Sequence, residues 1–231
     1  MAPILHLRRS DHPHLHNCVY AQHHPLKCTP DTICIRGCEY HRIYAEKNLL
    51  DVNGSTYRLN EGAWVNLDDT YGYVPYEGTA FEVQRTDSDG TTFMNINVNH
   101  GNNPQGEAYA YTLLPGANRE ETMTYAEDKS IEILSMTNSL HAVKDKETGN
   151  IYINAFEAGE SLNGLTFYTP CAIIISGNRI YVSDPSWTAD YVMLGFENNV
   201  SVVSDDDIYA DGNVVTVNMP IHGKTYSFEV H

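Results

Sequence analysis

Hydrophobic and polar positions alternate in short runs along most of this chain, from about residue 49 onward. In Thr91–Val98, Met94, Ile96 and Val98 occupy every second position, which is the period of a strand with one buried face. Asn-Gly, Asp-Gly and Ser-Gly-Asn sequences between the runs are typical of tight turns. Many short strands at this spacing predict an all-β fold of antiparallel sandwiches. Further strands are predicted at Ser55–Leu59, Ala63–Leu67, Tyr71–Val74, Glu107–Leu114, Ser139–Lys144, Ile151–Phe156, Leu165–Thr169, Ala172–Ser176, Arg179–Ser183, Tyr191–Phe196, Val214–Asn218 and Thr225–Val230.

One short helix is predicted among these strands, at Arg119–Glu127. Asn118 precedes it and can cap its amino end. Glu120 and Glu121 lie in its first turn, where acidic side chains interact favourably with the helix dipole. We expect this helix to be a connector between β-regions.

The β-region is expected to divide into two parts of unequal size. A break near Asn178–Pro185 separates an antiparallel sandwich at residues 43–178 from a small C-terminal β-sandwich at residues 179–231. The second part, on the order of 50 residues, is close to the lower size limit for independent folding.

Residues 1–42 have a different composition from the rest of the chain. They hold four of the five cysteines, seven of the eleven histidines and four prolines, which interrupt any regular period. We expect an irregular Cys/His/Pro-rich segment that is disordered or mis-translated, through a misread frame or a wrong start. Zinc binding and disulfides are the alternatives. The spacing of Cys28, Cys34 and Cys38 fits no common zinc pattern, so no metal site is assigned.

The formal net charge of −16 argues against nucleic acid as a partner, because binding it requires cations placed against phosphates. No stretch approaches the roughly 18 apolar residues of a membrane-spanning helix, so no membrane partner is predicted. No signal peptide is visible either, because Arg8, Arg9 and several histidines interrupt the first apolar residues.

Two acidic clusters raise the question of a structural cation. Asp205–Asp207, with Asp211 nearby, lack the Glu and Gly positions of an EF-hand loop, so a solvated turn is the preferred interpretation. Asp68 and Asp69 are a similar pair. No cofactor is predicted, and Ca²⁺ as a structural ion stays unassigned.

Two spaced motifs lie on either side of residue 105. His100–Pro104 reads His-Gly-Asn-Asn-Pro, and Tyr109–Gly116 reads Tyr-Ala-Tyr-Thr-Leu-Leu-Pro-Gly. This pair resembles the large β-domain of polysaccharide lyase family 8, which includes hyaluronate, chondroitin AC and xanthan lyases. The resemblance covers about residues 43–231, and other segments agree in family order: Ala63–Asp68, Gly72–Tyr73, Glu120–Glu127, Ile131–Leu134 and Val182–Ser186.

The resemblance implies that residues 43–178 are the end of a large central β-sandwich domain. In that family an N-terminal toroid of paired helices carries the catalytic Asn, His and Tyr. No part of this chain resembles the toroid, so no catalytic residue is assigned. The implied reaction is β-elimination at a uronic acid, which needs a base and a group that neutralises the adjacent carboxylate. The implied partner is an acidic polysaccharide bound through the missing toroid, and the implied location is extracellular.

The leading prediction is the C-terminal β-region of a polysaccharide lyase that cleaves uronic-acid-containing polysaccharides and is inactive by itself. A stand-alone carbohydrate-binding module and a purely structural β-module are the alternatives. Trp64, Tyr71 and Tyr73 are the candidates for carbohydrate contact, although they also alternate like core residues. His100, beside Gly101 and Pro104, is expected to serve a tight turn.

Overall fold

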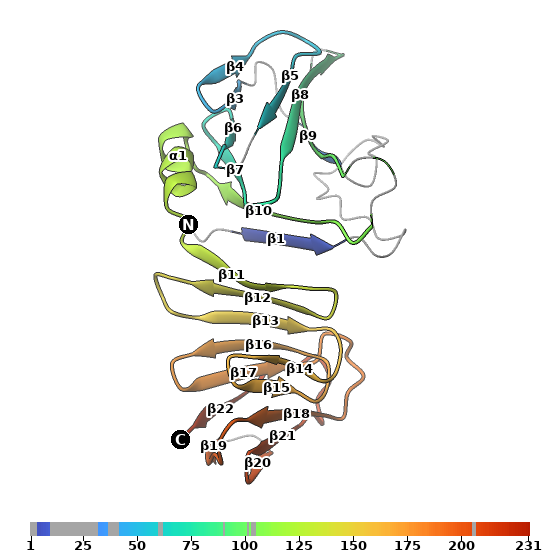
Figure 1. The fold of residues 1–231 in the computed structure, drawn as a ribbon, viewed down its shortest axis with the longest axis vertical. Coiled ribbons are helices and arrows are strands. Elements are labelled where there is room, and N and C mark those ends of the chain that lie inside the picture. Colours follow the sequence, from blue (N-terminus) through green and yellow to red (C-terminus); the bar gives the residue numbers. More distant parts are fainter. Residues whose placement is uncertain are drawn as a thin grey trace. The chain divides into compact units, whose positions relative to one another are not determined.

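The computed structural model (Figure 1) describes residues 4–9, 32–36 and 42–231, apart from 60–61, 90, 101, 103–104 and 205–206. For residues 4–9 and 32–36 it describes the backbone alone. The described residues form antiparallel strands and one short helix, which confirms the all-β prediction. No helix among them is long and apolar enough to cross a membrane. The chain consists of two compact units, residues 1–129 and 130–231.

Unit 1 contains two sheets whose inner faces form one core. Val65 and Tyr73 from one sheet pack with Phe81 and Met94 from the other, and all four side chains are buried. One sheet has the order β1 (Ile4–Arg9), β10 (Ala108–Pro115), β7 (Tyr71–Pro75), β6 (Val65–Leu67), β3 (Ile43–Ala45), β4 (Asn48–Leu50). The other has the order β2 (Thr32–Arg36), β9 (Thr91–Val98), β8 (Phe81–Ser88), β5 (Thr56–Leu59).

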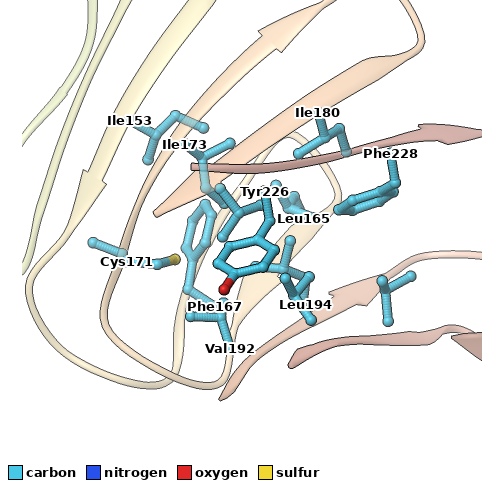
Figure 2. Packing of buried hydrophobic residues seen from close by; sticks show 14 of the residues in the cluster. Ile153, Leu165, Phe167, Cys171, Ile173, Ile180, Val192, Leu194, Tyr226 and Phe228 are labelled. Atoms are coloured by element: carbon cyan, nitrogen blue, oxygen red, sulfur yellow. The ribbon is translucent and has the colours of Figure 1, made fainter. Parts of the chain in front are cut away.

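Unit 2 is a sandwich with a single apolar core. Figure 2 shows Ile153, Ile173 and Phe228 from one sheet against Phe167 and Leu194 from the other. The larger sheet has the order β11 (Ile131–Met136), β12 (Leu140–Asp145), β13 (Ile151–Ala155), β16 (Cys171–Ser176), β17 (Arg179–Ser183), β22 (Tyr226–Val230), β19 (Val202–Val203). The smaller has the order β14 (Glu160–Leu162), β15 (Leu165–Phe167), β18 (Tyr191–Phe196), β21 (Val214–Asn218), β20 (Ile208–Asp211).

The helix α1 (Arg119–Glu127) has the predicted bounds and cap. The Asn118 side chain accepts a hydrogen bond from the Glu121 backbone N–H, and the Glu121 carboxylate accepts one from the Asn118 backbone N–H. This reciprocal pair is a capping box, which satisfies two amide groups that have no partner within the helix. The helix packs on β6 and β7, and its Ala126 belongs to a small apolar cluster with Trp64 and Val74.

The division between the two units differs from the expected break near residue 178. The boundary lies between Lys129 and Ser130. Residue 178 lies instead in the turn between β16 and β17, which pair antiparallel from Ala172–Ser183 to Ser176–Arg179. The turn residues around Asn178 therefore mark a hairpin inside one sheet, because tight turns join paired strands as readily as they separate domains.

The segment 1–42, expected to be irregular, contains two strands where its backbone is described. β1 pairs with β10, and β2 pairs with β9, so each extends a sheet of unit 1 by one strand. Both strands are short alternating runs, with Leu5 and Leu7 in β1 and Ile33 and Ile35 in β2. The cysteines and histidines of the segment lie outside the residues whose side chains are described.

Candidate functional site

Two of the three residues predicted to contact carbohydrate are buried. Trp64 is 7% exposed and Tyr73 is 3% exposed, so neither ring offers a free face to a sugar. Trp64 packs beside Tyr44, and Tyr73 lies in the core of the two sheets of unit 1. Tyr71 is 39% exposed and is the one of the three with accessible surface. Burial argues against carbohydrate contact by both residues: Tyr73 lies in the core between the two sheets, whereas Trp64 belongs to the apolar cluster that includes Ala126 of α1.

The two halves of the spaced motif meet in a row of aromatic rings. The His100 ring lies 5.9 Å from the Tyr109 ring, which stacks on Tyr111 with centroids 6.4 Å apart. Tyr111 in turn makes an edge contact with Phe81 at 5.8 Å. Burial raises the pKa of Tyr111 to about 12 and also raises that of Tyr73, so both phenols stay protonated at neutral pH. The row is a packing element, and the turn at 101–104 lies largely outside the described residues.

The acidic residue Asp69 is engaged by an arginine. Its Oδ1 accepts hydrogen bonds from Arg119 Nε at 2.8 Å and from the Arg119 backbone N–H at 3.0 Å. The side-chain bond, with the charge of Arg119, keeps the pKa of Asp69 below its usual value. The Arg119 guanidinium also lies 4.0 Å above the centre of the Tyr44 ring. A calcium ion bound to Asp69 would have to displace Arg119 from the carboxylate.

No group of three or more His, Cys, Asp or Glu side chains among the described residues is arranged to hold a metal ion. Asp205 and Asp206, and the cysteines of the first 42 residues, are outside the described side chains. The zinc and calcium alternatives at those positions therefore stay open.

The loop after β17 is organised around one carboxylate, and we call residues 184–190 the Asp184 loop. Asp184 Oδ1 accepts hydrogen bonds from Ser186 N and Oγ, at 2.8 and 2.7 Å. Its Oδ2 accepts from Thr188 N and Ala189 N, both at 2.7 Å. Burial of Asp184, which is 7% exposed, raises its pKa, but these hydrogen bonds outweigh that effect and lower the pKa to about 2.

The Asp184 loop carries Trp187, an exposed aromatic residue that sequence reasoning did not single out. Its exposed fraction is 66%, against 7% for Trp64. Its position in the sequence could have identified it: Trp187 follows Asp184-Pro185-Ser186, in a connection between two strands and outside any alternating run. An aromatic residue in a polar connection has no core position to occupy, and connections carry binding residues more often than core strands do.

Comparisons with known proteins point to one family. Residues 132–193 match the family described as polysaccharide lyase family 8, C-terminal beta-sandwich domain. The hyaluronate lyase HylB of Enterococcus faecalis is 32% identical over 127 residues, which cover 52% of this chain and 13% of that protein. The chondroitinase-AC of Pedobacter heparinus is 27% identical over 133 residues, covering 56% of this chain and 17% of that protein.

Solved structures show the same fold. The structure of the Paenibacillus xanthan lyase matches 87% of this chain and 23% of that chain, with a TM-score of 0.68 and 19% identity. A Streptomyces coelicolor chondroitin AC lyase structure matches 87% of this chain and 31% of that chain, with a TM-score of 0.60. This chain thus spans less than a third of either lyase.

Proposed function

We propose, on the premise that this chain belongs to the C-terminal β-region of polysaccharide lyase family 8, that it is the accessory β-part of an enzyme that cleaves uronic-acid-containing polysaccharides by β-elimination. By itself the chain has no turnover, and its place of action is extracellular. The observation that carries this proposal is the match of residues 132–193 to the family's C-terminal domain.

Each of the four histidines with a described side chain lies beside an aromatic ring or a carboxylate. β-Elimination requires a base near the uronate proton and a group that stabilises the charge developing on the carboxylate. The His141 ring packs edge-on against Phe156 at 5.0 Å, and burial, opposed by a backbone hydrogen bond, lowers its pKa. His100 packs on Tyr109. His222 and His231 lie near the carboxylates of Asp190 and Glu229, at 3.9 and 3.8 Å.

Exchange of this region between lyases tests the proposal. The C-terminal β-region of the Pedobacter chondroitinase-AC is replaced by this whole chain, and ultraviolet absorbance of the unsaturated uronate product is followed with chondroitin sulfate. We expect the chimera to retain activity and the same enzyme truncated without a replacement to lose it. A folded chimera with no activity contradicts the accessory role.

The isolated chain provides the second arm of this test. Incubated with hyaluronan, chondroitin sulfate or xanthan, it is expected to release no unsaturated product. Intact chondroitinase-AC under the same conditions is the positive control. Product formation that persists through further purification would place a catalytic group within this chain and refute the absence of turnover.

A further inference from the structure

Trp187 combines two features that cost free energy as long as no ligand is bound. Its side chain is 66% exposed, although a large apolar ring is stabilised by leaving water. Its backbone φ is +61°, a left-handed conformation that is an outlier for a bulky residue. Strained backbone of this kind persists only where the surrounding structure holds it, and such residues cluster at binding and catalytic sites.

The Asp184 carboxylate holds this conformation from both sides. Its oxygens accept hydrogen bonds from the backbone amides of Ser186 and Thr188, the residues immediately before and after Trp187. The Trp187 N–H also points to the Asp184 carbonyl oxygen, at 3.4 Å. The ring is therefore presented on a fixed backbone, which reduces the conformational entropy that a ligand would otherwise have to remove.

A glycine lies behind the Trp187 ring. A Cβ atom added at Gly223 would lie 3.2, 3.3 and 3.5 Å from three atoms of its six-membered ring, Cε2, Cδ2 and Cζ2. These similar distances place Gly223 against one face of the ring, where a larger residue would displace it. A hydrogen bond from Met219 N to the Asp190 carbonyl oxygen, at 2.8 Å, joins the segment that leads to Gly223 to the Asp184 loop. With one face covered and 66% of the residue exposed, the other face is open to solvent.

Polar side chains lie close to Trp187 and Gly223 in the sequence. The hydroxyl groups of Ser186 and Thr188 hydrogen-bond to each other at 2.7 Å. Asp190, whose side chain is 91% exposed, lies 3.9 Å from His222, which is 48% exposed. Next to these residues in the sequence, Tyr191 is 48% exposed and Ile221 is 61% exposed. The surface therefore offers both apolar and polar side chains.

We infer that Trp187 is a stacking platform for a pyranose unit of a polysaccharide. A pyranose ring has an apolar C–H face, which corresponds to the open indole face. Its edge of hydroxyl groups can meet the polar side chains of the Asp184 loop and His222. The choice of a uronic-acid polysaccharide as ligand rests on the proposed function, whereas the stacking site itself does not. Because Asp190 and the net charge of −16 oppose ionic capture of a polyanion, stacking carries the contact.

Quenching of tryptophan fluorescence locates the contact in the whole chain. The chain has two tryptophans, and acrylamide reaches Trp187 in preference to the buried Trp64. Oligosaccharides prepared from hyaluronan, chondroitin sulfate and xanthan, at concentrations up to about 10 mM, a weak-binding range, are expected to protect Trp187 from quenching. The absence of protection by all three and by a neutral cello-oligosaccharide would overturn the inference.

Titration calorimetry on matched variants tests the role of the ring. Trp187→Ala removes an exposed side chain, so it should stay folded, and it is expected to weaken binding at least about tenfold. Trp187→Phe retains an aromatic face and should bind with intermediate affinity. Tyr152→Ala, which removes an exposed aromatic ring from β13, is the control and should bind like the original chain. Equal binding by Trp187→Ala and the original chain would overturn the inference.

Two further comparisons separate this inference from the proposed function. If stacking carries the contact, raising the salt from about 50 to 500 mM should change the affinity less than about twofold, and a steep loss would indicate ionic capture instead. Binding of the neutral oligosaccharide alone would support the platform and count against the uronic-acid substrate of the proposed function. Binding of uronic-acid oligosaccharides with an inactive chimera would likewise support the platform alone.

Discussion

Asp184 illustrates how one buried acceptor organises a loop. Both of its oxygens accept two hydrogen bonds, all from residues 186–189. In Asp184→Asn, an NH₂ group, which cannot accept a hydrogen bond, replaces one of the two oxygens. One of the two pairs of donors therefore loses its acceptor. We expect a loss of about 1–3 kcal/mol in the free energy of unfolding, because hydrogen bonds to a charged acceptor contribute more than those to a neutral one. Urea unfolding, followed by circular dichroism, measures this loss.

The exposed Asp190 provides the matched control. Asp190→Asn makes the same chemical change on a side chain that is 91% exposed, so its effect should stay within about 0.5 kcal/mol. If the two variants are equally stable, the four hydrogen bonds of Asp184 do not contribute as described.

We also expect the contribution of Asp184 to folding stability to depend on pH. The folded pKa of Asp184, about 2, lies below the value of about 3.9 expected in the unfolded chain. The unfolded state therefore binds the proton first as the pH falls, and the stabilising contribution of Asp184 is present above about pH 4 and is lost towards pH 2. The difference in stability between the original chain and Asp184→Asn should be constant from about pH 5 to 7 and shrink below pH 4. A constant difference down to pH 2 would contradict this.

Position 72 requires a glycine because the Thr122 side chain lies too close to leave room for a Cβ atom. An added Cβ would lie 2.8 Å from Thr122 Cγ2, and Thr122 is fully buried and accepts a hydrogen bond from Asn66 Nδ2 at 2.8 Å. We expect Gly72→Ala to destabilise unit 1 by about 1–3 kcal/mol through overpacking. Thermal and urea unfolding followed by Trp64 fluorescence measures this.

A double-mutant cycle shows whether the clash is with Thr122. Thr122→Ala removes the crowding atoms, so Gly72→Ala should cost less in that background than in the original chain. Equal costs in both backgrounds would mean that Thr122 is not the residue that excludes a side chain at position 72.

At the scale of elements, the helix α1 depends on its cap. Asn118→Ala removes the acceptor for Glu121 N and the residue that completes the capping box. The expected cost is about 1 kcal/mol of unfolding free energy, measured by urea unfolding. Asn118→Asp keeps an acceptor at the amino end of the helix and should be close to the original stability. A destabilisation by Asp equal to that by Ala would contradict the capping role.

The elements also show where sequence reasoning succeeded. The bounds of α1, β9, β17, β18 and β21 agree with the predicted ranges, because a local cap or a clean alternation determines each of them. The strand β8 was not predicted. After Val83 its sequence is Gln-Arg-Thr-Asp-Ser, with little apolar alternation, and it is a strand because β5 and β9 pair with it on both sides. Arg85 is accommodated there by Asp87, Thr92 and the Leu50 carbonyl oxygen.

At the scale of the whole molecule, unit 2 has its own core. Every residue of that core lies between Leu140 and Phe228, so residues 130–231 are expected to fold without unit 1, as domains of about 100 residues do. A fragment of residues 179–231 should not fold, because it separates β17 from β16 and lacks four of the seven strands of the larger sheet and two of the five of the smaller. Circular dichroism and thermal unfolding compare the two fragments. Cooperative unfolding of 179–231, or none for 130–231, would contradict this division.

The amino-acid sequence by itself determined the class of fold, the position of the helix and the resemblance to the lyase family, because alternation, capping and motif order are local properties of the chain. Tertiary structure decided what depends on contacts between distant residues. It placed Trp64 and Tyr73 in the interior, joined residues 171–176 to 179–183 in one sheet, and left Trp187 in solvent. Period-two alternation indicates that one face of a strand is buried, but only the packing of sheets decides which aromatic rings remain outside.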